Sequence, residues 1–404
     1  MDPLLNPFSP GAGTPPPELA GRSDILKHAL ITLARVKRGR AEKSILMIGL
    51  RGTGKTVLLY EISRLAEKEG YHAIMIEAHE KKSLPELLLP DLRRVLFTLD
   101  AGEKISAKVK RAFRVLKSFI SSIKLNVKIK ELDLGIGIEP ERGSADSGDL
   151  ETDLAQVFIA LGEAAQDRHT SVAIIIDELQ YLNEEELSSL IMAAHKVSQK
   201  SLPIVVIGAG LPQLIGNAGR AKSYAERLFD FPELGPLNID DAKLALQEPV
   251  EKEGVKFSPD ALNEIIRVTQ GYPYFLQEWG YQAWNIAIKS PIDISVANQA
   301  TQVSIKRLDQ SFFRVRFDRL TPKEKEYLRA LAELGPVPQR SGDIATELGL
   351  DVKHVAPLRD NLIKKGMIYS PKHGDTSFTV PLFDGFMKRI MPDFHAVIKK
   401  KKLK

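Results

Sequence analysis

The sequence predicts an α/β fold: a doubly wound parallel sheet with helices on both faces, followed by a helical lid and a separate C-terminal module. Strand-like apolar runs alternate with helical patterns between residues 44 and 208, a glycine-rich loop joins the first run to a helix, and an acidic pair ends the third run. With 404 residues the chain also exceeds the size of one ordinary core, so we expect several domains.

Residues 1–17 are rich in proline, glycine and serine, which predicts an extended and poorly ordered arm. An α/β domain over residues 18–238 should follow. Apolar residues at helical spacing predict its first helix over 24–37, and the apolar run 44–48 predicts its first strand.

The segment behind this strand has the GxxxxGK[ST] pattern of a P-loop. In such a loop the backbone N–H groups converge on phosphate oxygens, and the following helix directs its positive end at the same anion. Lys55 would neutralise the β- and γ-phosphates, and Thr56 would ligate Mg²⁺. We therefore expect ATP or ADP with Mg²⁺ as cofactors. The residues expected to hold them are Gly49, Arg51, Gly52, Thr53, Gly54, Lys55, Thr56 and Val57.

The rest of the α/β domain continues the alternation of helix and strand. The strand 171–176 is apolar on both faces, as a central parallel strand should be. The expected elements are helix 56–69, strand 73–78, helix 154–165, strand 171–176, helix 184–197 and strand 203–208.

An insert over about residues 96–148 interrupts this alternation. Nine lysines and arginines lie in 104–130 with no acid between them, on a helical pattern, and alternation over 125–138 predicts a β-hairpin followed by a flexible loop. Three interpretations stay open: a projection that faces DNA, a surface that docks a partner, or a solvated insert whose acidic second half covers its basic first half.

The acidic pair Asp177 and Glu178 directly follows the third apolar run. Ligands of open α/β sheets bind at the C-terminal ends of strands, so the pair should face the P-loop. Asp177 would hold Mg²⁺ through water, and Glu178 would orient or deprotonate the water that attacks the γ-phosphate.

Together these motifs resemble the AAA+ class of ATPases, in particular its origin-recognition-like and STAND-like branch, over about residues 15–290. The resemblance implies that Gly21 and Arg22 form the box that lines the adenine pocket, and that Pro273 of Gly271-Tyr272-Pro273 abuts the base from the lid, expected over 239–290. Arg227 stands where that family places a finger that acts across a subunit interface, with Arg220 as second choice. A finger at Arg227 implies a homo-oligomer in the ATP-bound state.

Two departures from the family pattern bear on catalysis. The tip of the fourth strand, residues 208–212, reads Gly-Ala-Gly-Leu-Pro and offers no polar sensor of the γ-phosphate. The lid arginine of hydrolysing members is replaced by the Gly-Tyr-Pro sequence. We therefore expect slow ATP hydrolysis or switch-like behaviour.

The last part of the chain, residues 300–396, resembles a winged helix-turn-helix, and a basic tail over 397–404 ends the sequence. Helices are expected over 321–334, 341–349 and 352–365, then a wing with its tip at 372–375. Double-stranded DNA would bind the second of the last two helices and the wing, although Pro357 lies inside that helix and few side chains there read bases. The candidate DNA-binding residues are Lys353, His354, Arg359 and Lys372.

Composition excludes several other classes of function. The chain has no cysteine, which rules out disulfides, thiolate metal sites and a cysteine nucleophile, and its isolated histidines show no metal-ligand spacing. No signal peptide and no apolar stretch of about 18 residues is visible, so we expect a cytoplasmic protein with no membrane partner.

Three functions remain open from the sequence: a DNA-associated ATPase that assembles on ATP, a nucleotide-dependent signalling switch whose C-terminal module recruits a protein partner, and a regulator that binds nucleotide without hydrolysis. Truncation after Ile288 is expected to keep ATP binding.

Overall fold

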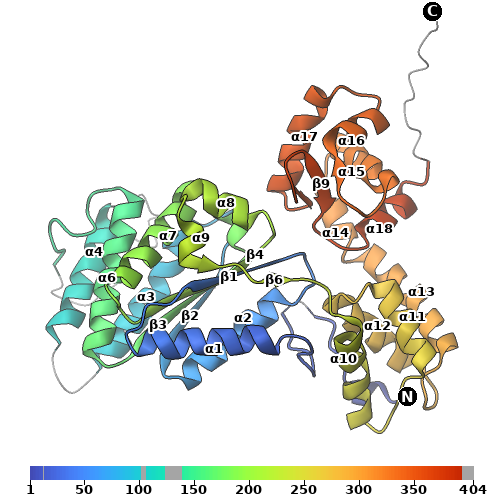
Figure 1. Cartoon of the computed structure of the whole chain (residues 1–404), viewed down its shortest axis with the longest axis horizontal. Helices are drawn as coiled ribbons and strands as arrows, with labels where there is room; N and C mark the ends of the chain where they lie inside the picture. The colour runs from blue at the N-terminus through green and yellow to red at the C-terminus, as the bar shows by residue number, and fades with distance from the viewer. Residues whose placement is uncertain (12, 102–105, 123–138, 394–404) are drawn as a thin grey trace, which may run out of the picture.

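The computed structural model describes residues 1–11, 13–101, 106–122 and 139–393. The chain forms an α/β domain, a helical lid beside it, and a C-terminal domain above the lid (Figure 1). In the described residues, no helix is long and apolar enough to cross a membrane.

A parallel sheet forms the centre of the α/β domain, as the alternation of strands and helices predicts. Its order is β2-β3-β4-β1-β5, and the two-residue strand β6 also pairs with β1. β3 and β4 are buried along their whole length. The strands are β1 (Ser44–Gly49), β2 (Tyr71–Glu77), β3 (Ser171–Asp177), β4 (Ile204–Gly210), β5 (Phe229–Asp230) and β6 (Glu233–Leu234).

Helices cover both faces of this sheet (Figure 1). On one face α1 and α2 bury apolar side chains against β1, β3 and β4. On the other face α3, α4, α6 and α7 form a larger apolar cluster. The helices are α1 (Ser23–Lys37), α2 (Lys55–Lys68), α3 (Leu84–Asp100), α4 (Ala107–Ser122), α6 (Leu150–Asp167), η2 (Leu179–Tyr181), α7 (Glu184–Gln199), α8 (Leu214–Ala221) and α9 (Ala225–Leu228).

The basic helix of the expected insert is α4, and neighbouring carboxylates neutralise part of its charge. Arg111 Nε lies 2.9 Å from Glu141 Oε1, and Arg114 also pairs with Glu141. Lys108 pairs with Glu163 of α6 at 2.8 Å. The pairs with Glu141 support the interpretation in which the acidic second half of the insert covers its basic first half, whereas Glu163 lies outside the insert. The expected hairpin lies outside the described residues.

Four helices make the lid. They are α10 (Ile239–Lys252), α11 (Pro259–Thr269), α12 (Pro273–Ile286) and α13 (Ile294–Gln310). The expected domain boundary at residue 300 therefore falls inside a helix. The physical reason is that α13 buries three small side chains and one large apolar side chain, which leaves a weak apolar pattern in the sequence. These buried residues are Ala297, Ala300, Ser304 and Leu308.

The C-terminal domain orders its elements as two helices, a strand, two helices, two strands and a last helix. Its antiparallel sheet runs β7-β9-β8. The last helix, α18, packs on α15 and was not expected from the sequence. The elements are α14 (Arg314–Phe317), α15 (Pro322–Leu334), β7 (Gln339–Arg340), α16 (Ser341–Glu347), α17 (Val352–Lys364), β8 (Ile368–Tyr369), β9 (Asp375–Phe378) and α18 (Phe383–Ile390).

An aromatic cluster joins the lid to the C-terminal domain. Phe313, between α13 and α14, lies 6.5 Å from Phe275 of α12 and 5.3 Å from Phe386 of α18, measured between ring centroids. Phe313 also lies 5.6 Å from Phe383. The two parts share one buried apolar cluster, so displacement of the lid should carry the C-terminal domain with it.

The N-terminal arm differs from the expected extended and poorly ordered segment: it contains a short 3-10 helix, η1 (Pro3–Leu5), and packs on the lid. Phe8 is only 2% exposed and lies on α12 where Gly280 has no side chain: a Cβ there would be 2.6 Å from the Phe8 ring. The Asn6 amide donates to the carbonyl of Tyr281 at 3.0 Å, and the Trp284 indole donates to the Asp2 carbonyl at 2.8 Å. The composition of the arm could not indicate that it packs on α12, because this packing depends on Gly280, far along the chain.

Candidate nucleotide site

The P-loop connects β1 to α2 and takes a shape that only glycine adopts easily at two positions. Gly52 has φ +83° and Gly54 has φ +89°, so both lie in the left-handed region. Gly49 has a different reason to be glycine: a Cβ there would lie 2.4 Å from the Leu234 carbonyl oxygen. Gly49 therefore permits close packing against β6 and does not line the cavity.

Lys55 starts α2, and its side chain turns back over the loop. Its ammonium donates to the carbonyls of Gly49 and Leu50, each at 2.9 Å. Burial lowers the pKa of Lys55 to about 8, an effect that the nearby Glu178 and Asp177 carboxylates oppose. A bound polyphosphate would give this buried ammonium anionic partners in place of the neutral carbonyls.

Thr56 and Asp177 are brought together by the pairing of β1, β3 and β4. Thr56 Oγ1 lies 2.5 Å from Asp177 Oδ2. Burial raises the pKa of the Asp177 carboxyl, and the Thr56 hydroxyl opposes that shift. One hydroxyl and one carboxylate fit Mg²⁺ that keeps several waters and phosphate ligands. The described residues contain no group of three acidic, histidine or cysteine ligands, which a metal held by protein alone would need.

Glu178 lies directly after β3 with φ +54°, a strained value for a residue with a side chain. One of its oxygens is 3.5 Å from Arg51 Nη1, and the other accepts a hydrogen bond from the Gln180 amide. Gln180 Oε1 in turn accepts from the backbone N–H of Leu211, at the tip of β4, at 2.9 Å. A polar side chain from η2 thus occupies the tip of the fourth strand, where the sequence shows no polar residue.

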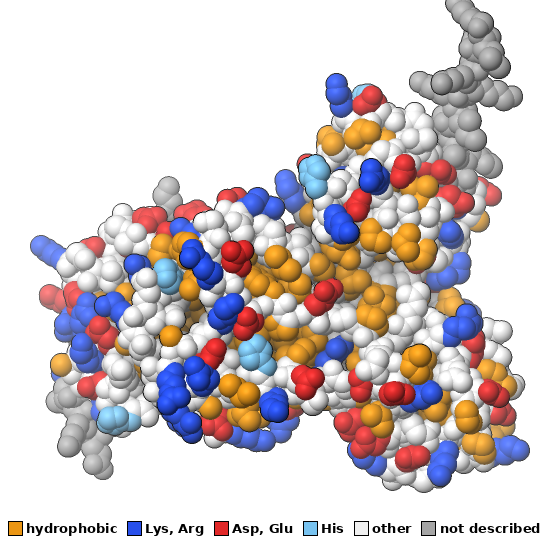
Figure 2. All heavy atoms as spheres, viewed as in Figure 1, with side chains coloured by type: hydrophobic (Ala, Val, Ile, Leu, Met, Phe, Trp, Pro, Cys, Tyr) orange, Lys and Arg blue, Asp and Glu red, His pale blue; other side chains and the backbone are white. Residues whose placement is uncertain are grey.

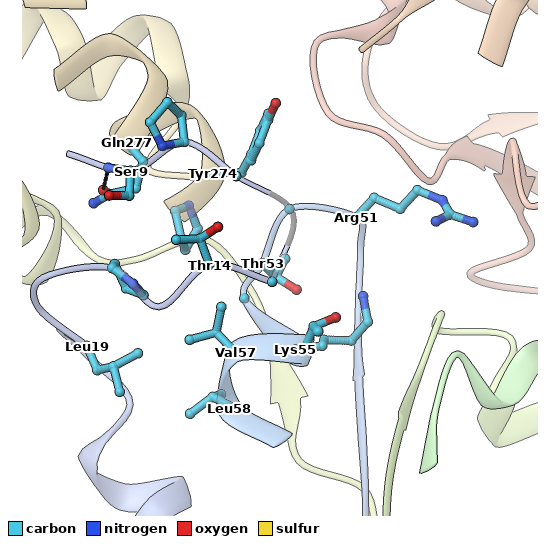
Figure 3. A pocket seen from close by; sticks show the side chains of 18 of the residues that line it. Ser9, Thr14, Leu19, Arg51, Thr53, Lys55, Val57, Leu58, Tyr274 and Gln277 are labelled. Atoms are coloured by element: carbon cyan, nitrogen blue, oxygen red, sulfur yellow. Dashed lines mark hydrogen bonds between the residues drawn. The ribbon is translucent and has the colours of Figure 1, made fainter. Parts of the chain in front are cut away.

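The opposite end of the cavity is formed by the arm and α12 (Figure 3). Ser9, Thr14, Leu19 and Gln277 lie at this end, whereas Arg51 and Lys55 lie at the other. The Ser9 backbone N–H donates to Gln277 Oε1 at 3.3 Å, which ties the arm to the lid. This end lies away from Arg51 and Lys55 and offers the apolar Leu19 together with the polar Ser9, Thr14 and Gln277, a combination that suits a base.

The structure brings most of the expected nucleotide-binding residues into one cavity. Those that line it are Arg22, Arg51, Gly52, Thr53, Gly54, Lys55, Thr56, Val57, Pro273 and Glu178. Arg22 donates to the carbonyls of Thr53 and Gly235, so it fixes the P-loop to the loop after β6. Gly21 does not line the cavity; a Cβ there would lie 2.5 Å from an Asp241 carboxylate oxygen.

Several lining residues were not expected from the sequence. The arm contributes Ser9 and Thr14, the lid contributes Tyr274 and Gln277, and the segment after α13 contributes Phe312 and Arg316. No local sequence pattern marks these residues, because each lies on a segment that reaches the P-loop only through tertiary packing.

The C-terminal domain touches the P-loop directly. The backbone N–H of Arg51 donates to the Thr379 carbonyl at 2.9 Å, and the Arg51 side chain points toward that domain in Figure 3. A Cβ on Gly366 would lie 3.1 Å from Arg51 Nη2. Arg51 therefore contacts both Glu178 and the C-terminal domain.

The remaining expected site residues lie away from this cavity. Arg227 is exposed on α9 and does not line it. Lys353 and His354 are exposed on α17, and Lys372 is exposed in the loop between β8 and β9. Arg359 differs from expectation: its guanidinium donates to Thr376 Oγ1 and the Asp375 carbonyl, each at 2.9 Å, so it holds α17 to β9.

Comparison with known proteins agrees with this geometry. Residues 18–207 match the model of the AAA ATPase domain, and residues 310–387 match a domain of unknown function, DUF8462. A search of curated proteins gives no match. The Walker-type ATPase PABY2304 of Pyrococcus abyssi superposes with a TM-score of 0.58 at 17% identity, over 92% of this chain and 96% of that one.

Two further solved structures resemble the chain less closely. The ORC1 protein of Aeropyrum pernix in complex with DNA gives a TM-score of 0.46 at 18% identity, covering 93% of this chain and 94% of its own. The RuvB Holliday junction branch migration motor of Thermotoga maritima gives 0.44 at 15% identity, with coverages of 92% and 95%. At these values neither bears on function. Residues 18–207 therefore resemble the AAA ATPase domain, and the α/β domain has the AAA+ P-loop fold.

Proposed function

We propose that this protein binds ATP with Mg²⁺, hydrolyses it slowly, and uses the nucleotide state to set the position of its C-terminal domain. The observation that supports this most strongly is the single cavity in which Lys55, Thr56 and Glu178 from the α/β domain meet Tyr274 of the lid and Arg316 of the segment after it. A ligand that fills this cavity would contact the α/β domain, the lid and the segment that leads to the C-terminal domain.

The chemistry follows from the side chains at the phosphate end. Lys55 and the P-loop N–H groups would hold the β- and γ-phosphates, and Thr56 with Asp177 would hold Mg²⁺. Bound Mg²⁺ would offset phosphate charge. Glu178 would orient the attacking water once its carboxylate turns from Arg51 and Gln180 toward the phosphate. Because two contacts hold Glu178 aside, turnover should be slow until they are released.

Coupling to the C-terminal domain has two routes. The aromatic cluster around Phe313 links the lid to α18, and the Arg51 N–H links the P-loop to Thr379. Closure of the lid on nucleotide would therefore move the C-terminal domain relative to the P-loop.

For the finer function we propose that the C-terminal domain is a winged helix that engages double-stranded DNA through Lys353, His354 and Lys372, and that ATP promotes a homo-oligomer in which Arg227 acts on a neighbouring subunit. The exposure of these cations supports the proposal. The alternative is recruitment of a protein partner. The mixed positive and negative side chains on the visible face of this domain, together with the engagement of Arg359, favour that alternative (Figure 2).

The test is phosphate release from Mg·ATP by wild type and by Glu178→Gln, with and without duplex DNA, together with the oligomeric state in each condition. We expect slow release that the substitution abolishes while ATP binding persists. Salt-dependent DNA binding supports the DNA function, because phosphate contacts weaken steeply with salt. Absence of DNA binding at low salt favours the protein-partner alternative. ATP binding with no release from wild type would leave a nucleotide-binding regulator.

A further inference from the structure

Arg316 is a cation at the nucleotide cavity that no motif assigns. It lies on α14, the four-residue helix between the lid and the C-terminal domain, and its side chain lines the cavity. Arg316 lies near two other cations, Arg51 and Arg319, and near the phenols of Tyr181 and Tyr274. Arg51 Nη2 donates to the Tyr181 hydroxyl at 3.1 Å. Arg51 also pairs with Glu178. Arg316 therefore lies at the phosphate end, on the side of Glu178.

The positive charge of Arg316 has no carboxylate partner among the ion pairs of the described residues. Its Nη1 donates to the Phe312 carbonyl at 2.5 Å, and its guanidinium lies 4.0 Å from the centre of the Phe312 ring. These contacts orient the fork without neutralising it. Burial and the repulsion from Arg51 lower the pKa of Arg316 to about 10.

Three cations thus meet at one end of the cavity: Lys55 and Arg51 from the P-loop, and Arg316 from α14. The carboxylates of Glu178 and Asp177 oppose the charge of Lys55, and Glu178 also pairs with Arg51. Like charges held together in a partly buried site are costly unless an anion of high charge joins them. A planar guanidinium fork matches a phosphate group in charge and geometry.

We propose that Arg316 binds the terminal phosphate of ATP from within the same chain and thereby distinguishes the triphosphate from the diphosphate. This rests on the proposed ATP-binding function. The P-loop and Lys55 would hold the β- and γ-phosphates from the α/β domain, whereas Arg316 would approach the γ-phosphate from α14, beside Arg51, which pairs with Glu178. In the lid itself the Gly271-Tyr272-Pro273 sequence offers no cation for this position.

The location of Arg316 gives this contact a consequence for the whole chain. α14 follows Phe313, whose ring contacts both the lid and the C-terminal domain. A γ-phosphate held by Arg316 would pull this junction toward the P-loop, and loss of that phosphate would release it. The same residue would thus recognise the triphosphate and report it to the C-terminal domain.

The experiment measures the affinities of the full chain for ADP and for the non-hydrolysable β,γ-imido analogue of ATP, both with Mg²⁺, by calorimetry. In Arg316→Ala we expect the affinity for the analogue to fall roughly 10- to 100-fold, the value of a charge-assisted contact, while the affinity for ADP stays within about twofold. Arg314→Ala is the matched control, since Arg314 lies on the same helix but is exposed and pairs with Asp318 at 3.0 Å. It should bind both nucleotides like wild type.

Arg316→Lys keeps the charge and loses the fork, and it serves if the alanine variant does not fold. It should bind ADP like wild type and the analogue several-fold more weakly. Equal weakening for both nucleotides, or none for either, in a folded Arg316 variant overturns the inference and leaves Arg316 a structural residue. Failure of wild type to bind either nucleotide would instead refute the proposed function itself.

Discussion

The arm on α12 gives the sharpest test of how the base end of the cavity is built. Phe8→Ala removes the ring that lies over Gly280 and leaves the rest of the arm unchanged. Because Ser9, Pro10 and Gly11 line the cavity directly after Phe8, loosening this anchor should loosen the wall of the base site.

The structure sets the expected size of the effect. Phe8 is 2% exposed, so its full side-chain burial is lost, about 2–3 kcal/mol for a ring on one helix. The larger values of about 3–5 kcal/mol apply to rings enclosed in a domain core. A loss of about 2–3 kcal/mol changes the ratio of docked to detached arm by roughly 30- to 150-fold. Weaker nucleotide binding follows, since only the docked state has the complete cavity.

Tryptophan fluorescence offers a direct assay. The chain has two tryptophans, both buried on α12. The Trp279 indole donates to Thr301 of α13, whereas Trp284, 2% exposed, contacts the arm. The Trp284 indole donates to the Asp2 carbonyl, so detachment of the arm should remove that bond. We expect a red-shifted emission and stronger acrylamide quenching in Phe8→Ala, with unchanged far-ultraviolet circular dichroism.

Leu4→Ala is the matched control, because Leu4 lies on the same arm and is 92% exposed. It should match wild type in quenching and in ATP affinity. If Phe8→Ala also matches wild type in both measurements, the arm does not form part of the nucleotide site.

Three further substitutions test other parts of the molecule. Lys55→Ala should weaken ATP binding roughly 100-fold or more in a calorimetric titration while thermal unfolding stays near that of wild type; unchanged affinity would refute the site. Arg227→Ala should lower turnover at saturating ATP by roughly 10³-fold with little change in binding, and Arg220→Ala should not; equal turnover would remove Arg227 from the mechanism. Lys365→Met should cost about 1–3 kcal/mol in urea unfolding at pH 7, because Glu324 Oε2, 2.7 Å from Lys365 Nζ, would lose its partner. Burial alone would raise the pKa of Glu324, but the hydrogen bonds from Lys365 and from the Thr321 N–H bring it below the usual value. The stabilisation from this pair is therefore present above about pH 4.3 and is lost as the pH falls through the folded pKa. The unfolding free energies of the two proteins should converge at that low pH, and a difference that persists at pH 3 would contradict the assignment.

The sheet and the phosphate end of the site could be predicted because their signals are local. The P-loop spacing, the apolar strand before it and the acidic pair at Asp177 each lie within a few residues, and backbone geometry fixes what such segments do. Strand β3 begins at the expected residue, and α2 begins within one residue of expectation. These elements need no knowledge of distant contacts.

The base end and the junction with the C-terminal domain could not be predicted, since both depend on packing between segments far apart. Phe8 is informative only once Gly280 is known to lie beneath it, and 272 positions separate them. Arg316 is one of several arginines in its segment until α13 places it at the P-loop. A glycine and an arginine carry no local signal of their partners.

The boundary between lid and C-terminal domain shows the same limit and yields a last prediction. Truncation after Ile288, which the sequence suggests should keep ATP binding, removes α13, Phe312 and Arg316 together. Phe312 stacks on Tyr274 with ring centroids 4.9 Å apart, and both line the cavity. The fragment should therefore bind ATP more weakly than the full chain.

The same fragment should also unfold at lower urea, because the cut exposes the faces of α11 and α12 that α13 covers. A chain ending after Leu320 retains Phe312 and Arg316 and serves as the comparison: it should bind ATP more tightly than the shorter fragment. Equal ATP affinity of the two fragments would mean that the segment after α13 takes no part in the site. It would also leave the proposed link between γ-phosphate and C-terminal domain without its structural basis, since that link passes through Arg316.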